Sequence, residues 1–454
     1  MSEAGPALPE PPANGFRTFL ILWSTQTLSL FGSFVSMFGV NIWLTRELYP
    51  DPTQRGALAL GLTATAIATT APLILMMPLA GAYADRHDKR RTMLIANVIN
   101  ALLSFVLAAM LATGTLTLGS AVVILASLAV TGAFHSASFD SSYGLLVPPH
   151  QLQRANGMMQ TSYGLSQLLA PALAAALIAT PVLARSAGPS LQWLGTFDNG
   201  VLFTFLADGV SFLVAALAIS AIRLPQPVRI GPLPTHSLWK DVRDGLEWIL
   251  HRRPFVWLIS FGSLVNLTFA PLILLLPLLV RDRMGTDLAA RGMSFEAALA
   301  LVNTAGGLGG VIGGIAISLT GGIRTHRTYV IVGAMIVLGL GEVIAGLSTS
   351  VWLCAVGMFV GELFVPMLNS TSYALWQTLT PPEMLGRALS SRRFISQSFF
   401  PLGTMVAGWL AVPIEPWLVV TLSGIALALI CAGQLMNPRF AQLETRMREA
   451  AARP

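Results

Sequence analysis

One apolar run covers residues 57–84 and another covers residues 92–113. From the end of the first to the start of the second, the chain reads Gly81-Ala82-Tyr83-Ala84-Asp85-Arg86-His87-Asp88-Lys89-Arg90-Arg91. A helix needs about 20 apolar residues to cross a hydrocarbon layer of roughly 30 Å, and both runs reach that length. The charged residues of the quoted stretch are therefore expected to form a short loop between two membrane-spanning helices.

Apolar runs of this kind recur along the whole chain. Of the 454 residues, 54% are hydrophobic and 11% are charged, against about 25% charged in an ordinary soluble domain, and the mean hydropathy is +0.69. The sequence shows none of the ten-residue alternation expected of a membrane barrel. We predict an all-α polytopic membrane protein with twelve transmembrane helices, at residues 17–45, 57–84, 92–113, 118–147, 152–183, 199–222, 255–280, 293–320, 327–347, 350–379, 383–412 and 415–436.

The basic residues are distributed unevenly between the two sides of these predicted helices. With the first residues placed inside, 21 of the 27 Lys and Arg lie on the inner side. The other side carries six: Arg46, Arg55, Arg185, Arg281, Arg283 and Arg291. This is the positive-inside pattern rather than a nucleic-acid-binding face, so we expect both termini in the cytoplasm of a bacterium, with the helices in its inner membrane.

An internal repeat divides the chain into two halves. The order Ser-Tyr, Pro-Pro, Arg-Ala, Ser-Gln, Pro occurs at Ser142-Tyr143, Pro148-Pro149, Arg154-Ala155, Ser166-Gln167 and Pro171, and again at Ser372-Tyr373, Pro381-Pro382, Arg387-Ala388, Ser396-Gln397 and Pro401. A diverged copy of six helices predicts two six-helix bundles related by a pseudo-two-fold axis. The expected units are a disordered tail at 1–16, bundles at 17–222 and 255–436, a linker at 223–254 and a second tail at 437–454.

The linker between the halves contains an amphipathic segment. From Trp239 to Leu250, apolar and charged residues alternate at helical spacing, which favours a helix at the membrane surface. A solvated linker helix without lipid contact is the alternative.

The loop at 81–91 resembles the signature Gly-x-x-x-Asp-Arg-x-Gly-Arg-Arg/Lys of the major facilitator superfamily, in which it joins the second and third helices. Asp88 stands where many members have Gly. The resemblance implies a latch that holds the halves together when the cytoplasmic side is closed, formed here by Gly81, Asp85, Arg86, Lys89 and Arg90. Gly81 is expected to let two helices approach, and Asp85 to cap a helix N-terminus or pair with an Arg. The alternative is that the cluster only sets topology.

Two further stretches look like the efflux branch of that superfamily, typified by macrolide and enterobactin exporters. They are the segment 377–387 and Asp208-Gly209-Val210-Ser211-Phe212. Ala170-Pro171-Ala172-Leu173-Ala174-Ala175 resembles the antiporter motif Gly-Pro-x-x-Gly-Gly, with Ala in place of Gly. The resemblance implies drug efflux and is consistent with antiport.

Four acids fall inside the predicted helices. Each is costly there, at about 2.5–3.5 kcal/mol on insertion scales, so each is a functional candidate. In the superfamily, the fourth and tenth helices line the central cavity, so Asp140 and Glu362 are the proton-coupling candidates, with buried hydrogen bonds as the alternative. Asp208 is expected to make a structural contact inside the first bundle, and Glu342 to lie close to the external surface.

Neutral polar residues are the candidates for contacting a substrate in the cavity: Gln26, Asn41, His135, Asn266 and Asn369. A satisfied interior histidine is the commoner role for His135. Cys354 and Cys431 lie in apolar segments and are expected to be small core residues, and no metal site or cofactor is expected.

These observations predict a monomeric, non-enzymatic secondary transporter, whose partners are a small molecule, protons and the lipid bilayer. We expect a proton-coupled exporter of a drug, macrolide or siderophore that works by alternating access. The alternatives are an uncoupled facilitator or a lysophospholipid importer on the same fold. A membrane enzyme would need convergent His and acid pairs at the membrane face, which this sequence does not show. It also contains no Walker loop or nucleophile elbow.

Overall fold

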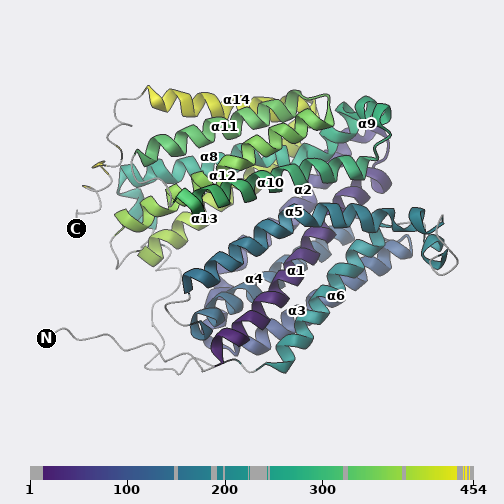
Figure 1. Cartoon of the computed structure of the whole chain (residues 1–454), viewed down its shortest axis with the longest axis horizontal. Helices are drawn as coiled ribbons and strands as arrows, with labels where there is room; N and C mark the ends of the chain where they lie inside the picture. Colours follow the sequence, from purple (N-terminus) through teal and green to yellow (C-terminus); the bar gives the residue numbers. More distant parts are fainter. Residues whose placement is uncertain are drawn as a thin grey trace.

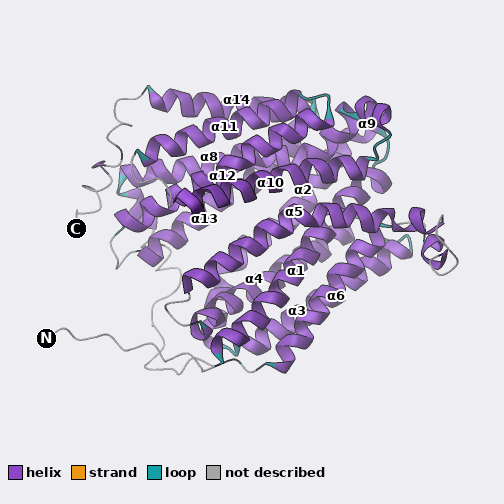
Figure 2. Ribbon diagram, in the orientation of Figure 1, coloured by secondary structure: helices purple, strands orange, loops and turns teal. Residues whose placement is uncertain are grey.

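The computed structural model describes residues 14–147, 152–185, 192–197, 200–222, 246–320, 326–380 and 385–436, and single residues at 224, 243, 443, 445, 446 and 449. Within these ranges the secondary structure is helical, with no strand (Figure 2). The first half contains α1 (Gly15–Trp43), α2 (Arg55–Arg86), α3 (Lys89–Ala112), α4 (Leu118–Leu146), α5 (Leu152–Arg185) and α6 (Val201–Ala221). The second half contains α8 (Arg253–Leu278), α10 (Phe295–Thr320), α11 (Arg327–Leu347), α12 (Val351–Leu379), α13 (Leu385–Leu410) and α14 (Pro416–Leu435), with a short α9 (Gly285–Arg291).

The prediction of twelve long helices is confirmed. Eleven of those described are long and apolar enough to cross a membrane. The twelfth, α13, is 26 residues long and carries Arg392 and Arg393 in its first third, which lowers its mean hydropathy without shortening it.

The helices form two bundles with matching contacts. In the first bundle α3 packs on α6 and α2 on α4, and in the second α11 packs on α14 and α10 on α12. Between the bundles, α5 contacts α10 and α2 contacts α13, so the fifth helix of each half meets the second helix of the other. This reciprocal pairing is what a pseudo-two-fold axis requires.

The two bundles meet at one end and diverge at the other, where α1 begins and α14 ends (Figure 1). We call these the closed end and the terminal end. One hydrophobic cluster at the closed end includes residues of both halves, such as Leu44, Leu58, Leu275 and Val420. At the terminal end each bundle has its own cluster, around Phe19 in the first and around Trp376 in the second. Among the described residues, the bundles therefore share a core at the closed end only.

The described end of the linker packs on the second bundle. Residues 246–250 are helical, and Ile249 is fully buried. The Trp248 ring meets Phe255 edge to face, with centroids 4.7 Å apart, and Arg252 lies over its other side. The apolar face of this part of the predicted amphipathic helix thus contacts protein. Residues 223 and 225–242 lie outside the described ranges.

Candidate functional site

Glu362 lies between the two bundles. It is the twelfth of the 29 residues of α12 and is half-buried. A Cβ built on Gly306 of α10 would lie 3.5 Å from its Cγ, and Tyr163 of α5, in the other bundle, is within electrostatic range. Within the described residues its carboxyl group has no hydrogen bond or ion pair, so it is open to a ligand or a proton.

Tyr163 and Phe34, both in the first bundle, form an aromatic pair. The side chain of Tyr163 is 48% exposed, and the edge of its ring meets Phe34 of α1, with centroids 5.5 Å apart. Aromatic faces attract cations, so an aromatic pair within electrostatic range of an unpaired carboxyl suits a protonated amine on an apolar body. The sequence did not single out Tyr163 or Phe34, because aromatic residues are spread along all the helices.

Asp140 lies in a different part of the space between the bundles. It is exposed on α4, six residues before the end of that helix, and Arg393 of α13 is its electrostatic neighbour. The structure therefore does not bring Asp140 and Glu362 together, since each faces a different group of the opposite bundle.

The neutral polar candidates for substrate contact differ in their burial and in their partners. His135 is 6% exposed and lies parallel to the Phe139 ring, inside the first bundle. Asn266 is half-buried, and its Nδ2 donates to the carbonyl oxygen of Gly262 at 2.9 Å. Gln26 and Asn41 are half-buried and Asn369 is exposed.

The loop at 81–91 ties helix ends of the first bundle. Lys89 Nζ donates to the carbonyl oxygen of Ala84 at 2.9 Å, and Arg90 Nε donates to that of Ile219 at 3.1 Å. These bonds satisfy carbonyl groups at the ends of α2 and α6, where a positive charge is favourable.

The other loop residues give a mixed result. Arg86 is exposed, and the side chain of Asp85 lies outside the described part of the structure. The expectation for Gly81 is wrong here, because a Cβ at that position would meet nothing within 4 Å. Asp88, which replaces the family Gly, is the N-cap of α3 and accepts a bond from the Arg91 amide at 3.0 Å.

The remaining membrane acids are enclosed by single bundles. Asp208 is 2% exposed and accepts bonds from Ser33 and Ser104, the structural contact expected of it. Glu342 lies five residues before the end of α11, yet it is 1% exposed and accepts a bond from Ser423. Its place near the end of α11 leaves the expectation of a position close to the external surface a prediction, while its side chain is enclosed by the second bundle.

Charged groups join the bundles at the closed end. Arg46 pairs with Glu296 at 2.8 Å, and Arg55 pairs with Glu415. Arg281 donates from Nη1 to the carbonyl oxygen of Tyr49 at 2.9 Å. We call these three contacts the closed-end clasp. The sequence reading missed it, although all three arginines were among the six assigned to the outer side.

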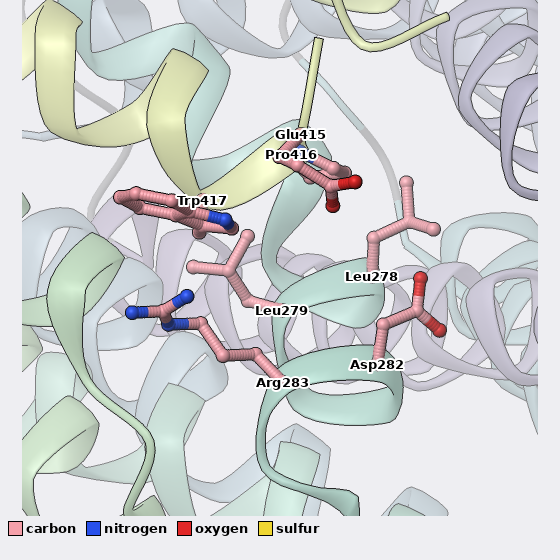
Figure 3. Close-up of a pocket in the computed structure, with 7 residues that line it drawn as sticks. All are labelled: Leu278, Leu279, Asp282, Arg283, Glu415, Pro416 and Trp417. Atoms are coloured by element: carbon pink, nitrogen blue, oxygen red, sulfur yellow. The ribbon is translucent and has the colours of Figure 1, made fainter.

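A pocket of about 150 Å³ lies beside the clasp, lined by Leu278, Leu279, Asp282, Arg283, Glu415, Pro416 and Trp417 (Figure 3). Its charged groups are already engaged: Asp282 with Arg281, Glu415 with Arg55, and Arg283 over the Trp417 ring. Ligand pockets usually measure about 300–1,000 Å³, so this pocket is small for a ligand-binding site.

Comparisons with known proteins agree with the fold. Residues 22–325 match the family model described as Major Facilitator Superfamily. Macrolide efflux protein A of Streptococcus pyogenes is 23% identical over 421 residues, which cover 91% of this chain and 95% of that protein. Multidrug efflux pump Tap of Mycolicibacterium fortuitum is 25% identical over 371 residues, covering 79% and 82%.

Solved structures are similar over almost the whole chain. A bacterial homolog to the human lysosomal transporter Spinster, in an inward-facing and unoccupied conformation, gives a TM-score of 0.66 at 14% identity, covering 98% of this chain and 100% of that one. A POT family transporter in complex with 5-aminolevulinic acid gives a TM-score of 0.69 at 12% identity, covering 93% and 96%.

Proposed function

Since this chain belongs to the Major Facilitator Superfamily of membrane transporters, we propose that it is a proton-coupled exporter of small amphipathic molecules, cationic ones above all. The observation that carries the proposal is the Glu362 carboxyl, unpaired among the described residues and placed between the bundles beside Tyr163. The names of the relatives, a macrolide efflux protein and a multidrug efflux pump, support export as the direction.

The chemistry of Glu362 supports coupling. An ionised carboxylate in an apolar setting is costly unless it is paired or neutralised. A proton and a cationic substrate each provide that compensation, and both cannot bind the same carboxylate as its counter-charge. Competition for one carboxyl therefore exchanges an inward proton for an outward substrate. Asp140, beside Arg393, stays the second candidate.

We propose that the terminal end faces the cytoplasm of a bacterium. The distribution of 21 and 6 basic residues supports this orientation, which makes the closed-end clasp external. In this state Glu362 would be reached from the cytoplasm. Transport then requires the clasp to open while the terminal ends of the bundles approach each other, as in alternating access.

The test is substrate-induced proton movement in everted membrane vesicles. Tetraphenylphosphonium, a macrolide and a catecholate siderophore are added after a pH gradient is imposed, and the gradient is followed with a fluorescent amine. Wild type is compared with Glu362→Gln and Asp140→Asn, and with Glu449→Gln as a control at an exposed tail position.

We expect at least one compound to collapse the gradient with wild type and Glu449→Gln but not with Glu362→Gln. Loss with Asp140→Asn instead would move the coupling to Asp140. Equilibration of labelled compound without any proton movement would show an uncoupled facilitator and contradict the proposal.

A further inference from the structure

Two buried hydrogen bonds occupy matching places in the two bundles. In the first, Ser104 Oγ of α3 donates to Asp208 Oδ2 of α6 at 2.8 Å. In the second, Ser423 Oγ of α14 donates to Glu342 Oε2 of α11 at 3.3 Å. The carboxyl residues are 2% and 1% exposed, so each bond lies in the interior of its bundle.

The helix registers of the two bonds are identical. Asp208 and Ser423 are each the eighth residue of their helices, α6 and α14. Ser104 and Glu342 are each the sixteenth residue of theirs, α3 and α11. These are the sixth and third helices of the two halves, so the carboxyl and the hydroxyl have exchanged sides between the copies of the repeat. We call the two bonds the exchanged pairs.

The two helices of each exchanged pair are packed so closely that the hydroxyl of one helix, rather than water, donates to the carboxyl group of the other. A Cβ built on Gly209 would lie 2.6 Å from Phe105 Cε1, and one on Gly424 would lie 2.6 Å from the carbonyl oxygen of Gly339. Helices this close leave little room for water beside the carboxyl groups. A buried polar group without a partner is costly, so each pair holds its two helices in one register.

The first bundle extends its pair toward the substrate site. Ser33 Oγ of α1 donates to Asp208 Oδ1 at 3.1 Å, so both carboxyl oxygens are engaged. The next residue, Phe34, contacts the Tyr163 ring, and Tyr163 lies within electrostatic range of Glu362. A short chain of contacts therefore runs from Asp208 through α1 to the aromatic wall of the site.

We propose that Asp208 is a positioning residue that fixes α1, and with it Phe34 and Tyr163, against Glu362. This positioning role rests on the proposed function, because it assigns the substrate to Glu362. The exchanged pairs also have a role that concerns only the packing of the bundles, which we call the lock: in both bundles, the pair holds the third and sixth helices in one register.

The lock is tested by copying the arrangement of the second bundle into the first. The variants are Asp208→Ser, Ser104→Glu and the double change, with the apparent melting temperature of purified protein as readout. We expect each single variant to lose at least about 5 °C, since Asp208→Ser leaves the Ser104 hydroxyl without its acceptor and Ser104→Glu places a second carboxyl beside the buried Asp208. We expect the double variant to recover more than half of the loss. The converse exchange, Glu342→Ser with Ser423→Asp, is the matched control. A double variant no more stable than its weaker single variant would overturn the lock.

Positioning is tested with Ser33→Ala, which leaves the Ser104–Asp208 bond intact. Ser423→Ala, which removes a hydroxyl far from α1, is the control. Hydrogen exchange without substrate should rise in peptides of α1 for Ser33→Ala and in peptides of α11 and α14 for Ser423→Ala. Unchanged exchange in α1 would overturn the positioning role.

Binding of tetraphenylphosphonium completes the test. We expect Ser33→Ala to weaken it about three- to tenfold, with a smaller loss of melting temperature than Asp208→Ser because the Ser104–Asp208 bond remains. We expect Ser423→Ala to leave the affinity unaltered. Equal affinity of Ser33→Ala and wild type would also overturn positioning. If wild type itself does not bind the cation while the exchange variants behave as expected, the lock stands and the proposed substrate class fails.

Discussion

Tyr163 of the first bundle lies within electrostatic range of Glu362 in the second. Its ring, 48% exposed, can lie against a cation held by Glu362, and such contacts contribute about 0.5–2 kcal/mol. We expect Tyr163→Leu to raise the half-saturating concentration of a cationic substrate about 3- to 10-fold, whereas Tyr163→Phe, which keeps the ring, stays within about twofold. Concentration-dependent efflux from energised vesicles measures both. Equal values for Leu and Phe would show that the ring does not contact the substrate.

Asp88 gives a residue-scale prediction for folding. Its side chain accepts the Arg91 amide at the start of α3, and losing such an N-cap costs about 1 kcal/mol. We expect Asp88→Ala to lower the thermal stability of the purified protein, Asp88→Asn to preserve it, and Asp88→Gly, which restores the family residue, to lie close to wild type. Melting curves in one detergent compare the three variants. An Ala variant as stable as wild type would contradict the capping role.

At the scale of single residues, the charged residues of the candidate site could be predicted from the sequence, whereas the aromatic residues could not. Glu362 was found because an acid inside an apolar run is rare and costly. Tyr163 and Phe34 could not be found, because an aromatic residue in a membrane helix is ordinary and only the packing of α1 against α5 brings these two together. The roles assigned to Glu362 and Asp140 stay predictions.

Among the elements, α12 is held at its start by a neighbour. Asp287 of α9 accepts a bond from the Val351 amide at 3.0 Å and pairs with Arg291. The Val351 amide bond, with smaller contributions from Arg291 and Ser350, lowers the pKa of Asp287 below its ordinary value of 3.8. Because the folded state favours the charged form, this contribution to stability is present above the unfolded pKa and is lost as the pH falls through the folded pKa.

We therefore expect Asp287→Asn to be less stable than wild type at pH 7. The difference should shrink as the pH falls below 3.8. Thermal unfolding of both proteins across this range measures it, with Glu449→Gln, at an exposed tail position, as control. A difference that stays constant down to the lowest pH would show that the charge of Asp287 is not what stabilises α12.

Most helices could be predicted because a run of about 20 apolar residues in the sequence indicates a membrane-spanning helix. Helices α3 and α11, for example, begin and end within three residues of their predicted bounds. The linker was less predictable, since amphipathic spacing alone does not distinguish lipid from protein as the partner of an apolar face. In the structure Ile249 packs on the second bundle.

For the whole molecule, the repeat predicted two bundles but not the state in which they meet. Short π-helical turns follow the first helix of each half, at Leu44–Leu48 and Leu279–Arg283, and both contain Leu-x-Arg followed by an acid. The arginines of these turns, Arg46 and Arg281, each cross to the opposite bundle. This repeated turn was present in the sequence. Its role depends on which ends of the bundles touch, and the order of residues does not specify that.

If the closed end opens during transport, a covalent bond across it must stop the cycle. A Cβ built on Gly56 lies 3.9 Å from Val412 Cα, close enough for a disulfide. We expect Gly56→Cys with Val412→Cys, in a chain whose buried Cys354 and Cys431 are changed to Ala, to cross-link on oxidation and lose export, and to recover it on reduction. Each single cysteine variant is the control.

A second cysteine pair, at Asp140 and Arg393, reports on the other end. These two residues face each other from opposite bundles without forming an ion pair, so their cysteines should be slow to cross-link at rest and become faster in the presence of substrate, when the terminal ends approach. Rapid cross-linking of this pair at rest, with none at positions 56 and 412, would mean that the resting protein is closed at the terminal end instead. Export that continues through an intact 56–412 disulfide would rule out opening of the closed end, and with it the rocking of two rigid bundles.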